Sequence, residues 1–193
     1  MSRWRIYCET EGAWIEGSGV SAPTTCYNDA GHAVTADSAD RLKNVPATWT
    51  ASDMKPTGTN GGTFTANAWQ TRTLNTLSGA NSADVTLNAN QVTLQQGTYL
   101  IEAVAPAYDV AEHHVRWRNV TDGTDAIVGS PLNSNDTSNT SRLSGHVVVG
   151  ASAKTFELQH RCLLTRETVG FGLASGFNVD EVYAVVTITK LSD

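Results

Sequence analysis

From Gly97 to its C-terminus the chain repeats one pattern, in which apolar and polar side chains alternate over short segments that end at turn signals. The segments are 97–103, 115–123, 143–149, 156–160 and 182–188. Successive side chains of a β-strand point to opposite faces, so this alternation is typical of strands with one buried face. Such strands must pair into sheets that cover each other. The pattern predicts an all-β fold and favours a structural or binding protein over an enzyme.

The overall composition agrees with this prediction. Of 193 residues, 40% are hydrophobic and only 17% are charged, which argues against disorder throughout. Thr, Ser, Asn, Gly and Val are abundant, and these residues suit strands joined by polar turns. A formal net charge of −6 argues against a nucleic-acid partner, because neutralising phosphates requires a basic surface.

Membrane insertion and secretion are not supported by the sequence. No run approaches the ~20 apolar residues that a membrane-spanning helix needs. The basic N-terminus, residues 1–5, leads into a mixed strand and not into the apolar core of a signal peptide. We expect the chain to be made in a cytoplasm, which leaves open where it works.

The first part of the chain differs from the rest in its sequence pattern. In residues 1–45, a strand with Trp4, Ile6 and Cys8 on one side leads through a turn into 13–16, which predicts a small hairpin. A hairpin of this size has no independent core and needs a partner surface. We therefore interpret 1–45 as an anchoring segment.

The remaining residues divide into a linker and a larger domain. Residues 46–63 hold Pro46, Pro56 and a Gly-rich run, which predicts a linker. Residues 64–193 contain eight to ten strand candidates at regular spacing, the pattern of a sandwich or jelly roll. The longest expected loop is 129–141.

The domain at 64–193 resembles the C1q/TNF-like jelly rolls at the ends of bacteriophage tail and virion fibre proteins. The resemblance rests on segments 69–76, 94–99, 105–107, 116–123, 156–160 and 181–184. It implies a ten-stranded, two-sheet sandwich that assembles as a homotrimer on a virion tail or capsid. The leader at 7–11 and 23–28, with His32, also resembles a short leader of some viral structural proteins.

Trimerisation implies a contact surface that one chain uses three times. Aromatic residues are enriched at such interfaces, although packing within one chain is the alternative for each. The residues we expect there are Tyr99, Phe171, Phe177 and Tyr183.

The expected function is that of a virion structural protein. It would bind other virion proteins through 1–45 and itself through the jelly roll. Loops at 108–114 and 129–141 would contact a host glycan or protein, since loops on rigid sandwiches commonly hold binding residues. The expected contact residues are Tyr108, His113 and Asn135.

Two other functions compete with this one. A carbohydrate-binding receptor-recognition module would use exposed aromatics, for which Tyr108, Trp117 and Trp69 are the candidates. A hydrolytic tail spike would need paired carboxylates, which the sequence does not place together. Neither a nucleophile elbow nor a phosphate-binding loop occurs, so we predict no enzyme activity and no cofactor.

Cysteine and histidine residues provide the candidate metal ligands. Cys8, Cys26 and His32 are suitable zinc ligands, but a closed site needs four and no further cysteine or histidine lies near. Packed thiols are the favoured interpretation, with a Cys8–Cys26 disulfide and a zinc site as alternatives. His113 and His114 point to opposite faces of a strand, so we expect solvated histidines there. For His160 we expect a core position with a hydrogen-bonded partner.

Overall fold

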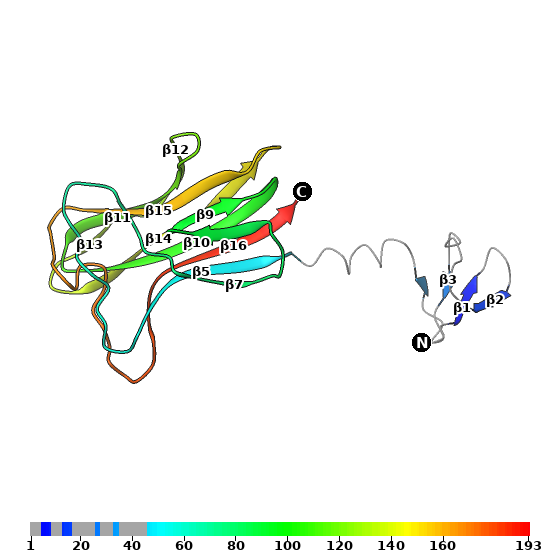
Figure 1. Cartoon of the computed structure of the whole chain (residues 1–193), viewed down its shortest axis with the longest axis horizontal. Coiled ribbons are helices and arrows are strands. Elements are labelled where there is room, and N and C mark those ends of the chain that lie inside the picture. The colour runs from blue at the N-terminus through cyan, green and yellow to red at the C-terminus, as the bar shows by residue number, and fades with distance from the viewer. Residues whose placement is uncertain (1–4, 9–12, 17–25, 28–32, 35–45) are drawn as a thin grey trace. The chain divides into compact units, whose positions relative to one another are not determined.

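The computed structural model describes residues 46–193 and, in addition, the backbone of 5–8, 13–16, 26–27 and 33–34 (Figure 1). Met1–Val45 and Pro46–Asp193 form separate compact units. In the first unit, four short strands make a sheet of order β2-β1-β3-β4, with bounds β1 Arg5–Cys8, β2 Ala13–Glu16, β3 Cys26–Tyr27 and β4 Ala33–Val34. The predicted hairpin is confirmed, because β1 and β2 pair antiparallel from Arg5↔Glu16 to Cys8↔Ala13.

The second unit is a sandwich of two antiparallel sheets. Sheet 1 has the strand order β14-β10-β16-β5-β7. Its strands are β5 Thr48–Lys55, β7 Thr76–Gly79, β10 Gly97–Tyr108, β14 Ser138–Val149 and β16 Glu181–Ser192.

Sheet 2 has the strand order β12-β11-β15-β9-β8, with two further short strands paired at its sides. The main strands are β8 Val85–Asn88, β9 Gln91–Leu94, β11 Ala111–Asn119, β12 Thr124–Val128 and β15 Lys154–Cys162. Of the two short ones, β6 (Gln70–Thr71) pairs with β15, and β13 (Leu132–Ser134) pairs with β11.

The order of the strands makes this sandwich a jelly roll. From β10 onwards the chain passes from sheet 1 to sheet 2 and back, so neighbours within a sheet are mostly not consecutive in sequence (Figure 1). No helix occurs in the described part of the chain, and hence none there could cross a bilayer. The prediction of an all-β jelly-roll sandwich is confirmed.

The expected linker at 46–63 is not a linker in the structure. Its first half forms β5, which lies between β16 and β7 and pairs with both. Trp49 of β5 is 1% exposed and Ala51 is fully buried. The prolines that suggested a linker lie outside this strand, at positions 46 and 56, where a missing N–H breaks no ladder. This segment is therefore part of the sandwich.

The core lies between the two sheets and follows from the alternation in sequence. Every second residue of β10 from Gly97 to Ala107 is buried, and β11 and β15 show the same period of two. Trp117 and Phe156 stack in this core with ring centroids 5.6 Å apart. Burial of side chains this large contributes most of the stabilisation, and truncating either to Ala would cost about 3–5 kcal/mol.

Candidate functional site

Two of the four expected trimer-contact residues lie inside the protomer. Tyr99 is fully buried, and its hydroxyl donates to the Gln95 carbonyl at 3.0 Å. Tyr183 is 6% exposed and donates to the Thr59 carbonyl at 2.8 Å. Tyr99 lies on the covered side of β10, and a register shift between Val182 and Val185 brings Tyr183 to the covered side of β16. Neither residue therefore reaches a second chain without unpacking the core. This corrects the expectation for these two residues.

The two phenylalanines differ from each other. Phe171 is half-buried and stacks on Phe64, with centroids 4.4 Å apart, beneath the guanidinium of Arg72. Phe177 is 78% exposed in the segment between β15 and β16. Of the four residues, only Phe177 presents a largely free aromatic ring.

The three expected receptor-contact residues do not form one site. His113 is 2% exposed and lies inside β11, so the expectation of a solvated loop histidine is wrong. The segment 108–114 is mostly strand, because β10 ends at Tyr108 and β11 begins at Ala111. Tyr108 is half-buried, whereas Asn135 is exposed between β13 and β14.

The metal candidates of the first unit are only partly described. Cys8 and Cys26 are register partners across β1 and β3. Cα atoms of directly opposed antiparallel residues lie ~4.5–5.5 Å apart, a range compatible with a disulfide. His32 lies outside the described residues. Among the residues that are described, no three metal-ligating side chains cluster.

A buried polar cluster lies at one end of the sandwich, and no signal in the sequence pointed to its central residue. Arg72 is fully buried; it donates to the Pro106 carbonyl and to the Phe171 carbonyl, both at 3.1 Å. Burial lowers the pKa of Arg72 to about 9, against an opposing effect of Asp53. Burial also raises the pKa of Asp53, whose carboxylate forms an ion pair only with Lys55 in the described region, at 3.8 Å.

Beside Arg72 lie two buried histidines that bond to each other. His113 Nδ1 and His160 Nε2 are 3.0 Å apart, so one nitrogen donates to the other. This confirms the core position expected for His160. Burial, and secondarily Arg72, lowers the pKa of His113 to about 4 and that of His160 well below its usual value. Both rings are therefore neutral at pH 7.

On the outer face of sheet 1, strands β10 and β16 are nearly free of charge. We call the outward side chains of β10 and β16 the sheet-1 face; they are Thr98, Leu100, Glu102, Val104, Pro106, Tyr108, Val182, Val185, Thr187, Thr189 and Leu191. Only Glu102 among them is charged. Cross-strand register places Val104 opposite Val185 and Glu102 opposite Thr187.

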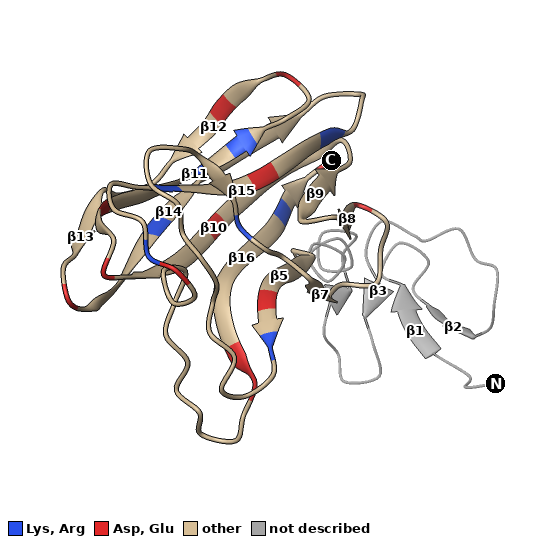
Figure 2. Cartoon of the chain, turned by 60° about the vertical axis from the view of Figure 1, so that its left-hand side comes forward, with Lys and Arg blue, Asp and Glu red and all other residues tan. Residues whose placement is uncertain are grey.

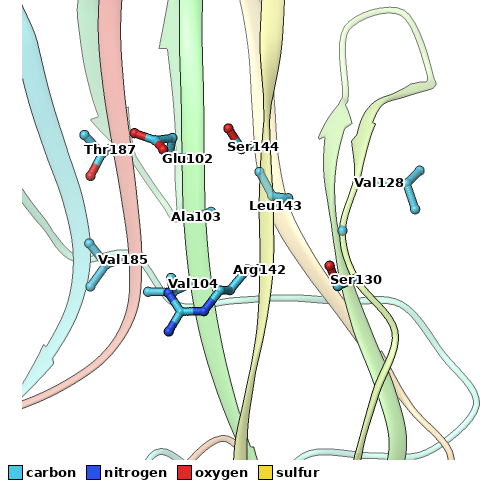
Figure 3. A pocket seen from close by; sticks show the side chains of 11 residues that line it. Glu102, Ala103, Val104, Val128, Ser130, Arg142, Leu143, Ser144, Val185 and Thr187 are labelled. Carbon is cyan, nitrogen blue, oxygen red and sulfur yellow. The ribbon is translucent and has the colours of Figure 1, made fainter.

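A shallow hollow of about 540 Å³ runs across this face and reaches the neighbouring strand β14 (Figure 3). Glu102 and Thr187 lie side by side in it, and the Arg142 guanidinium lies beside Val104. Neither Glu102 nor Arg142 forms an ion pair with another described residue. The face thus combines apolar surface with one uncompensated charge of each sign.

The outer face of sheet 2 has the opposite character. Charged residues of both signs follow β11, β12 and β15 (Figure 2). Asp125 accepts from Arg116 at 3.0 Å and from Arg118 at 2.8 Å, and Arg116 also donates to Gln159. This part of sheet 2 is a solvated surface whose polar groups bond to one another.

Comparison by sequence identifies no relative. No protein-family model matches the chain, and no curated protein matches it.

Comparison by structure finds many similar chains, among them murine APRIL and the vertex protein P5 of PRD1. Murine APRIL at pH 8.5 covers 76% of this chain and 99% of its own, with 8% identity and a TM-score of 0.44. The structure of murine APRIL at pH 5.0 gives 10% identity and a TM-score of 0.45 at the same coverage. The vertex protein P5 of PRD1 covers 75% of this chain and 96% of its own, with 17% identity and a TM-score of 0.39.

Proposed function

We propose that the chain is a structural protein of a bacteriophage virion, a tail or capsid fibre or decoration protein. It assembles as a homotrimer through the sheet-1 face, attaches to the particle through residues 1–45, and presents its jelly roll to the host. The single observation that most supports this proposal is the nearly uncharged sheet-1 face.

A fully solvent-exposed sheet face would carry polar residues at most of its outward positions, as the outer face of sheet 2 does. The sheet-1 face instead carries Leu100, Val104 and Val185 on its central strands. Interface cores are depleted of charged residues, and a three-fold axis uses one such face three times. Glu102 and Arg142 provide opposite charges that can pair between copies. The proposed occupant of the face is therefore a second copy of the chain.

The first unit supports the attachment role by its size. Its four described strands are two to four residues long. Strands this short form few ladder hydrogen bonds, so contacts with a second protein would stabilise the sheet. We assign that role to another protein of the virion.

The trimer is tested by light scattering of the purified protein. We expect a mass three times the 20.6 kDa of one chain. Val185→Glu adds a charge to the sheet-1 face beside Val104 and is expected to give monomers. Thr86→Glu, on the exposed part of β8 in sheet 2, is the matched control and should stay trimeric. A monomeric wild-type protein, or a Val185→Glu variant that remains trimeric, would contradict the proposal.

A further inference from the structure

The outer face of sheet 2 contains a second hollow, which adjoins the bonded polar surface described above at Arg116. It has a volume of about 670 Å³ and lies over β11, β13, β15 and the residues that precede β6. We call it the Trp69 groove. Its principal outward side chains are Trp69, Glu112, His114, Asn133, Arg161 and Leu163.

Trp69 forms a fixed aromatic wall of this groove. The Arg116 guanidinium lies 4.1 Å from its ring centroid, and the His114 ring meets it edge-on at 5.1 Å. Such contacts hold an aromatic ring in one orientation. A ligand that stacks on the remaining ring surface therefore loses little side-chain entropy from Trp69.

The polar side chains of the groove keep their hydrogen-bonding capacity. Register places Glu112 opposite Asn133 and His114 opposite Arg161. None of these four side chains donates to or accepts from another described residue. On the same face, Glu157 accepts from Thr71 at 2.7 Å and from Gln91 at 2.8 Å. The contrast within one face shows that the groove residues are free to bond a ligand.

The chemistry of the groove selects a class of ligand. Arg161 attracts an anion that Glu112 repels, and the reverse holds for an ammonium group, so the two charges together give neither sign of ligand a net advantage. A carboxylate, a guanidinium and an amide bond readily to hydroxyl groups, while an aromatic ring stacks on an apolar sugar face. We propose that the Trp69 groove binds a neutral saccharide. The proposal deepens the host contact of the proposed function and rests on it, since such a saccharide would belong to the host surface.

The test uses the full chain on an array of neutral and acidic oligosaccharides, followed by titration calorimetry with the strongest neutral binder. Glu112→Gln and Arg161→Gln change exposed side chains that bond to no other residue of the described sandwich, so the fold is kept. Each is expected to raise Kd about tenfold, as the loss of a hydrogen bond to a charged group does. Arg118→Gln, which lies on the same face outside the groove, should leave Kd unchanged.

Three results would overturn the inference: no binding to any neutral oligosaccharide, binding to acidic ones alone, or an equal loss in Arg118→Gln. Light scattering of the same samples separates this inference from the proposed function. A trimer that binds no saccharide rejects the groove and keeps the virion assembly. A monomer that binds through Glu112 and Arg161 keeps the groove and rejects the trimer.

Discussion

At the scale of single residues, the main feature is a group of titratable side chains inside an otherwise apolar sandwich. Arg72 bonds two backbone carbonyls, but its Nε has no partner within the described residues. His113 and His160 satisfy one nitrogen each and leave His113 Nε2 and His160 Nδ1 unpaired. Incompletely satisfied buried groups are destabilised further when they gain charge.

The histidine pair predicts a loss of stability in mild acid. In the unfolded chain a histidine has a pKa near 6.5, whereas that of folded His113 is about 4. The unfolded state therefore binds protons first as the pH falls. Stability is complete above pH ~6.5 and decreases below it, by up to about 1.4 kcal/mol per pH unit for each histidine. Urea unfolding between pH 7.5 and 4.5 measures this slope.

Two variants identify the source of the slope. His113→Gln removes one buried titratable group. It should flatten the pH dependence of the free energy of unfolding and lower that free energy at pH 7.5. His146→Gln changes an exposed histidine of β14 and should leave the slope as it is. If both variants kept the wild-type slope, the buried pair would not be its cause.

At the scale of elements, two loops depend on one carboxylate. Glu181, at the start of β16, accepts N–H bonds from Gly58 at 3.0 Å, Ser175 at 3.1 Å and Gly176 at 2.8 Å. These bonds lower the pKa of Glu181 to about 2. The carboxylate thus ties the loop after β5 to the loop before β16, which carries Phe177. Its contribution is present above pH ~4.5 and is lost only as the pH falls towards 2.

Removing this charge should loosen both loops. Glu181→Gln replaces one acceptor oxygen with an amide donor that faces backbone N–H groups, so the ties to Ser175 and Gly176 weaken. Limited proteolysis with chymotrypsin should then cleave faster after Phe177, which is 78% exposed. Asp180→Asn changes the exposed neighbouring carboxylate and is the control. Equal cleavage rates in Glu181→Gln and wild type would show that the loops do not depend on Glu181.

Much of the element scale was predictable from the sequence. All five segments of the alternating pattern became parts of β10, β11, β14, β15 and β16, since a period of two is a local property of the backbone. Strand β5 is not predicted, because Pro46, Pro56 and the Gly-rich run around its short sequence are typical of a linker. Its pairing partner, β16, lies more than a hundred residues away, and no local pattern reports such a pairing.

At the scale of the whole molecule, the sandwich at 46–193 has a core of its own. Among the described residues, the buried side chains of the two hydrophobic clusters come from 49–188. The chain divides into compact units between Val45 and Pro46. We therefore propose that attachment and assembly belong to different parts of one chain.

Deleting residues 1–45 should accordingly leave fold and assembly intact. We expect the deletion to change the free energy of unfolding of the sandwich by less than about 1 kcal/mol. Because 1 kcal/mol corresponds to ~2–8 °C for domains of this size range, the thermal midpoint of the 46–193 variant should stay within about 2 °C. Calorimetry and light scattering measure both properties, and the truncated chain should no longer bind virions. A truncated chain that became monomeric would move the assembly contacts into the first unit.

The sequence by itself determined the strands that carry the alternating pattern, because side-chain direction in a strand follows from position along it. Only the tertiary structure decided which side is covered. It placed Tyr99 and Tyr183 in the core, brought His113 and His160 within 3.0 Å, and enclosed Arg72. It also left the Trp69 groove open beside a bonded polar network. These outcomes depend on pairings between distant segments, and such pairings set burial and electrostatics.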